Sequence, residues 1–390
     1  MRLTKIAARI IRDSRGEKTI EVAVASRRFA AKASIPSGKS TGKFEAVSLP
    51  AKQAIRKIKS AAPLISKLDF KSQKDFDKFL IQLDGTKDKS NLGANSTLAL
   101  SLGFARLNAK KNGVPLYKYI SRLSGIKPRK PRIYANLINA GLHAKTGPAF
   151  QEYIVVPVSN NTKSDIKIIN SFYRELGRLL KKNKVLAGVG DEGGYMLKSK
   201  DDSLPFLIFD YIKDRLRLRG KVNYAIDVAA SSFYKNGKYR LNSGLVDTNE
   251  LTKIYSAIAT GFDIISIEDP FEEEDFRSFA KLRDAVNTII VGDDLTVTNP
   301  ARIKRAHAAK SINGVIIKPN QIGTLTETIE AAKLAKKYGF KIIASHRSGE
   351  TKDDWICDVA VGLGAFGIKI GAPRTPYRLA KYKRLAEIKI

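Results

Sequence analysis

The strongest constraint on the fold is a series of short apolar runs in the C-terminal half of the chain, each closed by a polar residue. The runs end at Asp227, Glu268, Asp293, Lys318, His346 and Lys369. The gaps between these residues are 41, 25, 25, 28 and 23 positions, and about 25 positions accommodate one strand, one helix and two short loops. With two earlier apolar runs, RIYANLINA and FQEYIVVPV, eight strands can be counted. Eight strands alternating with helices predict a closed α/β barrel.

In such a barrel we expect the carboxyl ends of all strands to meet at one face, so that the six polar residues converge on one pocket. Asp227, Glu268 and Asp293 offer only oxygen ligands, which suits Mg²⁺ better than Zn²⁺ or copper. The two lysines and the histidine that face this metal are what proton abstraction beside a carboxylate requires. They supply a base with a lowered pKa and cations that hold the enolate.

The N-terminal third has a different pattern of apolar residues. Residues 3–35 alternate in the manner of three strands, which predicts a small antiparallel meander. Helical patterns follow in 51–68, around 76–83 and in 95–111, after which VPLYKYISRL at 114–123 leads to a Pro-rich basic stretch. The Pro-rich basic stretch around 126–131 separates this part from the alternating strand and helix patterns that follow. We therefore predict an α+β N-terminal domain over 1–126 and an α/β barrel domain over 132–390.

Composition favours a folded protein in a reducing compartment. The chain has 390 residues, 43% of them hydrophobic, and no apolar run approaches the roughly 18 residues that span a bilayer. The basic start lacks an uninterrupted apolar segment and runs straight into a strand pattern, so no signal peptide is expected. The single cysteine, Cys357, cannot form an internal disulfide. These features predict a cytoplasmic protein without a membrane span.

The net charge of +32 is unusual. A field of that sign attracts nucleic acid, an anionic membrane or an anionic small substrate. The densest basic clusters are KPRKPR at 127–132 and the tail with Arg374, Arg378, Lys381, Lys383 and Arg384. No zinc-ligand pattern and no RNP-type aromatic motif accompanies them. We interpret the clusters as a solvated basic surface, and a nucleic-acid-binding role remains an alternative that depends on charge alone.

Three glycine-rich stretches imitate nucleotide-binding motifs. GVGDEG at 188–193 carries two carboxylates where a pyrophosphate would lie, and GLGAFG at 362–367 precedes a strand instead of following one. Gly38-Lys39-Ser40 ends like a P-loop, but Ala33 stands where the first glycine is required. None of the three predicts a nucleotide site.

Ordered motifs over nearly the whole chain resemble the enolase family, the phosphopyruvate hydratases. They are DSRGEKTIEV, PSGKSTGKFEA, LDGTKDKSNLGAN, QEY at 151–153, VGDEGG, SIEDPF, GDDLTVTNP, KPNQIGTLTET, SHRSGET and IKIGAP. The resemblance implies an α+β N-terminal capping domain, with a mobile loop at 36–43, and a (β/α)8-type barrel with atypical first strands. It also implies the reversible, Mg²⁺-dependent dehydration of 2-phosphoglycerate to phosphoenolpyruvate, in glycolysis and gluconeogenesis.

The resemblance assigns roles to the strand-end residues. It implies that Asp227, Glu268 and Asp293 bind a first Mg²⁺ and that Ser40 joins a second one. Lys318 resembles the base that removes the C2 proton, and we expect neighbouring cations to lower its pKa from about 10.4 toward neutrality. A lysine or histidine base with one or two Mg²⁺ ions is the known pattern of this superfamily.

Further residues resemble the substrate contacts of the family. Glu192 resembles the acid that helps to expel the C3 hydroxyl, with Glu152 beside it as a catalytic and binding group. Lys369 is expected to touch the substrate carboxylate, and Arg347 with Ser348 the phosphate. His143 and His346 fall at the family's flap and pocket positions, with His346 also a catalytic candidate. Lys39 departs from the alanine that the family usually has, and His307 matches no functional position.

Two alternatives stay open at this point. Another superfamily enzyme, a racemase or cycloisomerase acting on a carboxylate without phosphate, would share the three metal ligands. SHRSGET, with groups for a phosphate, and GDEGG, with an acid for a departing hydroxyl, both favour the dehydratase. The family's subunits pair, so a homodimer or a higher homo-oligomer is expected.

Overall fold

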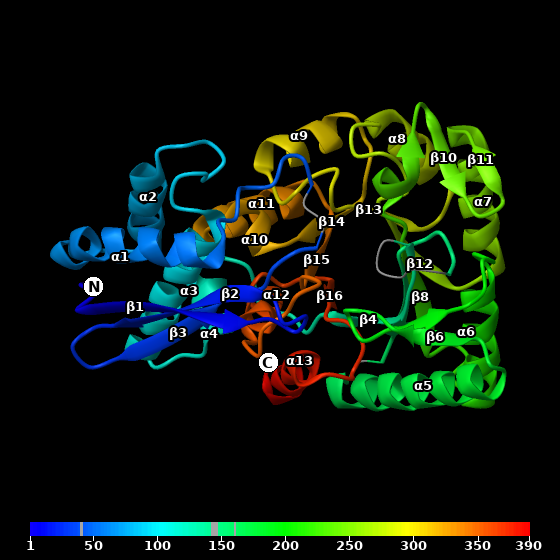
Figure 1. Cartoon of the computed structure of the whole chain (residues 1–390), viewed down its shortest axis with the longest axis horizontal. Coiled ribbons are helices and arrows are strands. Elements are labelled where there is room, and N and C mark those ends of the chain that lie inside the picture. The colour runs from blue at the N-terminus through cyan, green and yellow to red at the C-terminus, as the bar shows by residue number, and fades with distance from the viewer. Residues whose placement is uncertain (40–41, 142–146, 160) are drawn as a thin grey trace.

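The computed structural model describes residues 1–390 except 40–41, 142–146 and 160. Its N-terminal part begins with an antiparallel sheet in the order β1 (Lys5–Arg12), β2 (Lys18–Ala25), β3 (Ala30–Ser34). Four helices follow, α1 (Ala51–Lys67), α2 (Gln73–Asp84), α3 (Ala94–Lys111) and α4 (Leu116–Ser124). The meander and the three helices predicted from the sequence are thus confirmed, whereas α4 was not predicted (Figure 1).

The packing of α3 on the sheet holds the N-terminal part together. Val22 and Val24 of β2 are buried, and the side chain of Val24 lies over Gly103 of α3. A Cβ at Gly103 would come within 2.9 Å of that valine, so only glycine allows the helix to approach so closely. Phe76 of α2 stacks on Phe104 of α3 with ring centroids 4.2 Å apart. Together these contacts form one apolar layer between sheet and helices.

Eight strands close into a barrel in the rest of the chain. Their order is β4 (Arg132–Asn139), β5 (Glu152–Pro157), β8 (Val222–Asp227), β12 (Ile264–Glu268), β13 (Ile289–Gly292), β14 (Gly314–Ile317), β15 (Lys341–Ser345) and β16 (Gly367–Lys369), and β16 pairs with β4. Tyr134, Ile154, Val156 and Ile316 are among the buried side chains that fill the interior. The barrel is therefore a packed core, as the fold requires.

Helices cover the outside of the barrel, and several short strands lie outside the eight that close it. The helices are α5 (Thr162–Lys182), α6 (Leu204–Arg215), α7 (Thr248–Gly261), α8 (Phe276–Ala285), α9 (Pro300–Ala308), α10 (Pro319–Ile322), α11 (Leu325–Lys337), α12 (Trp355–Gly362) and α13 (Pro376–Glu387), with a 3-10 turn at Ala230–Phe233. The hairpin β6 (Leu186–Val189) and β7 (Tyr195–Leu197) extends from β4, and β9 (Tyr234–Lys235), β10 (Lys238–Leu241) and β11 (Gly244–Val246) form a separate small sheet.

The direction of β5 differs from the expectation that all strand carboxyl ends share one face. β5 is antiparallel to both β4 and β8, because β4 connects to it without a crossover helix. Its first residue, Glu152, therefore lies opposite Asp227, the last residue of β8. The reversal brings the beginning of β5 to the rim where its neighbours end.

The N-terminal part reaches the same rim of the barrel. Thr97 of α3 donates to the carbonyl of Gly323 at 2.8 Å, and Arg106 of α3 pairs with Asp353 after β15. Backbone bonds join Ser37 to Gly349. The segment that carries Lys39 is therefore held over the carboxyl-terminal rim (Figure 1).

Candidate active site

The six polar strand-end residues meet at the carboxyl-terminal rim, beside a cavity of about 230 Å³. Asp227 and Glu268 end β8 and β12, and Lys369 ends β16. Each of the other three follows its strand by one residue, namely Asp293 after β13, Lys318 after β14 and His346 after β15. Five of the six line the cavity, and Glu268 touches Lys369 beside it. The convergence predicted from the sequence spacing is thus observed.

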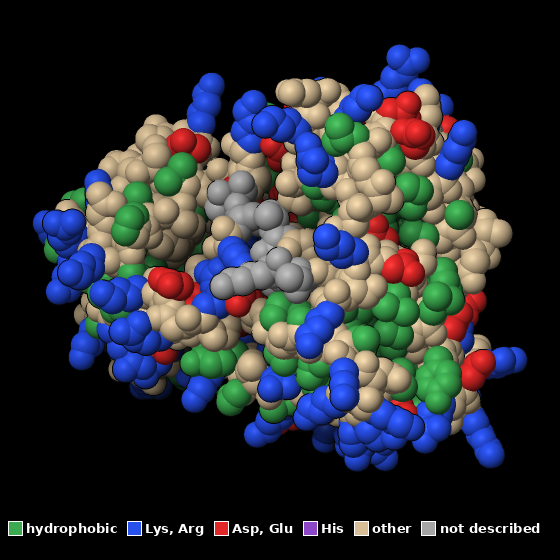
Figure 2. All heavy atoms as spheres, turned by 45° about the vertical axis from the view of Figure 1, so that its right-hand side comes forward, with side chains coloured by type: hydrophobic (Ala, Val, Ile, Leu, Met, Phe, Trp, Pro, Cys, Tyr) green, Lys and Arg blue, Asp and Glu red, His purple; other side chains and the backbone are tan. Residues whose placement is uncertain are grey.

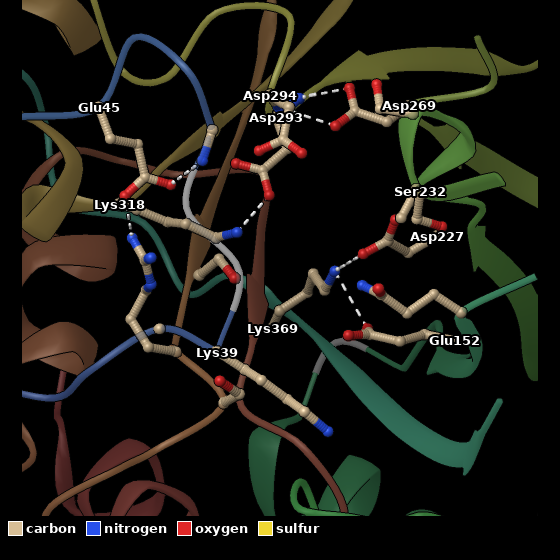
Figure 3. A pocket seen from close by; sticks show the side chains of 18 of the residues that line it. Lys39, Glu45, Glu152, Asp227, Ser232, Asp269, Asp293, Asp294, Lys318 and Lys369 are labelled. Atoms are coloured by element: carbon tan, nitrogen blue, oxygen red, sulfur yellow. Dashed lines mark hydrogen bonds and ion pairs between the residues drawn. The ribbon is translucent and has the colours of Figure 1, made fainter. Parts of the chain in front are cut away.

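Lys369 lies at the centre of a group of buried carboxylates (Figure 3). Its Nζ is 2.9 Å from Asp227 Oδ2, 2.9 Å from Glu268 Oε2 and 3.1 Å from Glu152 Oε2. Burial lowers the pKa of Lys369, but the three carboxylates outweigh burial and hold that pKa well above its usual range. Burial first, and then the charge of Asp227, raise the pKa of Glu268 well above its usual range. Oxygens of several strand ends thus converge on one cation, and this donor set fits a hard divalent cation.

Lys318 contacts Asp293, the third predicted ligand, through its ammonium group (Figure 3). Burial, Arg347 and Lys369 each lower the pKa of Lys318. The charges of Asp293 and Glu268 outweigh these effects and raise it above the usual lysine value. The carboxylate of Asp293, which contacts the ammonium group directly, thus holds Lys318 in its charged form. The lowering of this pKa by bound Mg²⁺ stays a prediction.

Two further acids, Asp269 and Asp294, stand beside this group, and the sequence analysis did not single them out. Within the described part of the chain, Asp269, Asp293 and Asp294 form an acidic group whose ligand atoms all lie within 4.8 Å. The carboxylate of Asp269 accepts the backbone N–H groups of Asp293 at 2.9 Å and Asp294 at 2.7 Å. Asp269 thus positions the loop that carries Asp293. The second acid in each of SIEDP and GDD was the available signal.

Glu192 belongs to a buried polar network on another side of the cavity. Its Oε2 accepts Nδ2–H of Asn136 at 2.8 Å and lies 3.2 Å from Nε2 of His346. Burial, followed by the charge of Glu192, raises the pKa of the neighbouring Glu152 well above its usual range. The structure therefore brings Glu152, Glu192 and His346 together as predicted. Asn136 was missed, although it is a polar interruption in an otherwise apolar strand.

Arg347 and Ser348 line the cavity beyond Lys318. The guanidinium of Arg347 pairs with Glu45 at 2.9 Å, and Ser348 Oγ accepts from Arg15 at 3.2 Å. Glu45 and Arg15 come from the N-terminal part, and no sequence spacing connects them to the barrel. Ser40 and His143, the remaining predicted site residues, lie outside the described residues.

Lys39 also lines the cavity, at its N-terminal side. Its Nζ is 3.6 Å from Oδ2 of Asp191, the residue before Glu192. The two side chains are 47% and 35% exposed, so this ion pair is partly solvated. Lys39 therefore connects the segment before Ser40 with the loop that carries Glu192.

A closed α/β barrel with acids, two lysines and a histidine at its carboxyl-terminal rim defines an enzyme of the acid–base class. The family model described as "Enolase, C-terminal TIM barrel domain" matches residues 130–389, and "Enolase, N-terminal domain" matches residues 3–120. A relative named "Enolase" from Methanopyrus kandleri is 41% identical over 99% of this chain and 95% of its own length. Two relatives of the same name, from the Gardel and Welgevonden strains of Ehrlichia ruminantium, are 41% identical over 100% of this chain and 96% of their length.

The chain belongs to the enolase family, and its activity is that of a carbon–oxygen lyase, phosphopyruvate hydratase. The family implies a small-molecule substrate and a divalent metal ion, and the acidic residues at the rim fit such an ion. Within the described residues, every helix is too short or too polar to cross a lipid bilayer.

Proposed function

We propose that the residues at the rim divide the dehydration of 2-phosphoglycerate between a base and an acid. Lys318 takes the C2 proton, and Glu192 gives a proton to the departing C3 hydroxyl. The observation that supports this division is that the two groups reach one cavity from different elements, Lys318 after β14 and Glu192 from the loop between β6 and β7. Lys369 lies between the carboxylates and holds the substrate carboxyl group.

The remaining roles follow the same arrangement. Arg347 and Ser348 bind the phosphate, and Glu152 assists Glu192. Asp227, Glu268 and Asp293 would hold a first Mg²⁺, and Ser40 a second. Bound Mg²⁺ supplies the positive charge that stabilises a second negative charge on the substrate carboxyl group. His143 is proposed as a further substrate contact.

The basic test follows phosphoenolpyruvate formation by its ultraviolet absorbance. With 2-phosphoglycerate, we expect an absorbance rise with Mg²⁺ and none with excess chelator. No Mg²⁺-dependent signal would overturn the proposed substrate and metal. Arg347→Ala tests the phosphate contact against the superfamily alternative, because it should weaken binding of the phosphorylated substrate.

A second test separates Lys318 from Glu192 by nuclear magnetic resonance of 2-phosphoglycerate in deuterated water. Lys318→Ala should abolish both product formation and exchange of the C2 proton. Glu192→Gln should block product yet leave exchange, because the base remains and the carbanion can return. Each loss of product should be about 10²- to 10⁴-fold, since a positioned proton transfer typically contributes that much. Exchange at the wild-type rate in Lys318→Ala would remove Lys318 as the base, and His346 would be tested next.

We propose further that the protein acts in the cytoplasm as a homodimer or larger homo-oligomer. We also propose a domain boundary at 126–131, which is supported by the absence of helix and strand between α4 and β4 in the described residues and by two family-model matches that end at 120 and begin at 130. The segment 36–43 is proposed as a mobile loop that changes position when substrate binds. Sedimentation at several protein concentrations tests the oligomer, and limited proteolysis with and without substrate tests the loop.

A further inference from the structure

Arg378 is a fully buried arginine on α13, with 0% of its surface exposed. Its guanidinium donates to the carbonyl of Arg347 at 3.0 Å and to the carbonyl of Ser348 at 2.8 Å. The same Nη1 also contacts Nδ1 of His346. All three contacts are to consecutive residues of the loop after β15, so a single side chain from the last helix fixes the loop that forms one wall of the cavity.

The contact with Arg378 determines which nitrogen of His346 carries the proton. A guanidinium has only donor groups, so the Nδ1 that faces it must be an acceptor without a proton. In neutral imidazole the proton then lies on Nε2. Burial first, and then Arg378, lower the pKa of His346 to about 4 against the opposing effect of Glu192, so the ring is neutral near pH 7.

The protonated Nε2 lies close to Glu192. Nε2 lies 3.2 Å from Oε2 of Glu192, within donor–acceptor distance, although it completes no hydrogen bond within the described part of the chain. Oε2 also accepts from Asn136 at 2.8 Å. Oε2 of Glu192 therefore faces two groups that can donate to it, the amide of Asn136 and Nε2 of His346.

Gly371 makes this arrangement sterically possible. A Cβ at this position would lie 2.7 Å from the carbonyl oxygen of Glu192, and 3.2 Å from both Cδ of Arg378 and Cε1 of His346. Its φ of 75° is also one that glycine adopts without strain. The three residues thus pack around one glycine, and their relative position is defined by the fold.

We propose that Arg378 is a positioning residue that acts through His346 on Glu192. Arg378 selects the Nε2–H tautomer of His346, so that a donor and not an acceptor faces Oε2 of Glu192 and helps to hold this carboxyl group in position for proton transfer. The proposal goes beyond the roles proposed above but depends on the role of Glu192 as the acid. It predicts that loss of Arg378 slows the departure of the hydroxyl and leaves removal of the C2 proton nearly intact.

The tautomer can be read directly from wild-type protein. The chain has three histidines, so nitrogen-15-labelled histidine gives few ring signals, and His346→Gln identifies those of His346. We expect Nδ1 of His346 to be unprotonated and Nε2 protonated at pH 7. A protonated Nδ1 would overturn the proposal, whatever the outcome of the kinetic tests. In Arg378→Met we expect a mixture of tautomers or a reversal.

Kinetics test the path from Arg378 to Glu192. In Arg378→Met, product formation should fall by about 10- to 100-fold, as displaced catalytic groups often cost, while C2 exchange stays within about threefold of wild type. In a His346→Gln background, the further change Arg378→Met should have little additional effect on product formation, because the path is already broken. Equal losses of exchange and product, or fully additive losses, would overturn the proposal. If Glu192→Gln itself keeps wild-type product formation, the role of Glu192 fails instead, independently of the tautomer.

Lys381 offers a matched control on the same helix. It is also 0% exposed, its ammonium pairs with Glu350 at 2.6 Å and it bonds to the carbonyl of Thr351, but it does not contact His346. Lys381→Met should destabilise the protein and leave the ratio of exchange to product formation unchanged. A change of that ratio equal to the one in Arg378→Met would mean that any buried cation of α13 has this effect, which would overturn a specific role for Arg378.

Discussion

Two clusters of basic residues that look alike in sequence differ in how far their side chains are buried in the folded protein. In KPRKPR, the side chains of Lys127, Arg129 and Lys130 are exposed, and none of the ion pairs among the described residues involves them. On α13, by contrast, Arg378 and Lys381 are completely buried and bonded to the loops around the active site. The expectation of a solvated basic surface holds for the first cluster and is wrong for these two residues of the second.

The difference shows that periodicity carries information that charge density does not. Arg378, Lys381, Tyr382 and Leu385 follow the spacing i, i+3, i+4, i+7 and all lie on the buried face of α13. Lys383, between them in sequence, is exposed. Buried cations need partners, whereas exposed cations of the same type need none. Figure 2 shows the exposed Lys and Arg side chains spread around the visible face instead of gathered in one stripe.

The largest contrast between buried and exposed cations is expected at Lys369. Lys369→Met leaves Glu152, Asp227 and Glu268 buried without their shared cation. Breaking a buried ion pair by removing one partner costs about 3 to 5 kcal/mol, and we expect this loss in the free energy of unfolding measured with a chelator present. Added Mg²⁺ should restore part of it, because the ion binds the folded state. Activity should be lost.

Lys336→Met is the matched control for that prediction. Lys336 is an exposed lysine in the last turn of α11, and its replacement should change the free energy of unfolding by no more than about 0.5 kcal/mol. Denaturant titrations of both variants and the wild type give the comparison. Equal stability of Lys369→Met and Lys336→Met would contradict the view that burial distinguishes the two kinds of cation.

Next in size is the acid sensitivity caused by His346, the partner of Arg378. Its folded pKa is lowered to about 4, whereas an unfolded histidine titrates near 6.5. Below pH 6.5 the unfolded chain therefore binds a proton that the folded chain does not, so stability falls as the pH decreases toward 4. The loss over this window is about 3 kcal/mol. His346→Gln should lack it, so unfolding free energies of the two proteins at pH 7, 5.5 and 4 should converge, and parallel curves would contradict the assignment.

The sequence predicted the strand-end residues of the candidate active site better than it predicted the residues that hold them in position. Gaps of about 25 positions locate strand ends, because each βα unit returns the chain to the same face. This logic found Asp227, Lys318 and Lys369. It could not find the reversed direction of β5, because a short connection between two apolar runs permits pairing in more than one way. The meander and the first three helices of the N-terminal part followed from their periods alone.

Supporting residues escaped prediction because their partners are remote in sequence. Arg378 meets His346 across a sequence separation of 32, and Glu45 meets Arg347 across 302. Only the folded structure shows that a basic residue of the tail lies against the acid–base network. The family resemblance supplied the groups that are proposed to touch substrate, whereas the residues that hold these groups in place had to be identified from contacts in the structure.

A smaller effect is expected from Lys39, which is more exposed than the buried cations of α13 but still forms an ion pair. Its ion pair with Asp191 is 3.6 Å long and partly exposed, and such pairs contribute about 0.2 to 1 kcal/mol. Lys39→Ala should therefore lower kcat/KM by no more than about fivefold, and high salt should reduce the difference because it screens the pair. Asp191→Asn should give a similar loss, and the double variant should lose little more. Steady-state kinetics at two salt concentrations decide this, and fully additive losses would mean that the pair does not act as a unit.

The smallest effect is expected at the exposed cluster. A large effect there would contradict the view that only buried cations need partners. In the triple variant Lys127→Gln, Arg129→Gln, Lys130→Gln, no buried group loses a partner, so the free energy of unfolding should change by no more than about 0.5 kcal/mol per site and turnover should be unchanged. The same variant tests the nucleic-acid alternative. Each phosphate contact to a single strand contributes about 0.7 to the slope of log affinity against log salt, so three lost contacts would reduce the slope by about 2. Because the charges are scattered and no RNA-binding motif accompanies them, we expect no retention of single-stranded RNA on filters at physiological salt for either protein. Retention by the wild type that the triple variant loses would show that the exposed cluster, too, has a partner, and that it lies outside the chain.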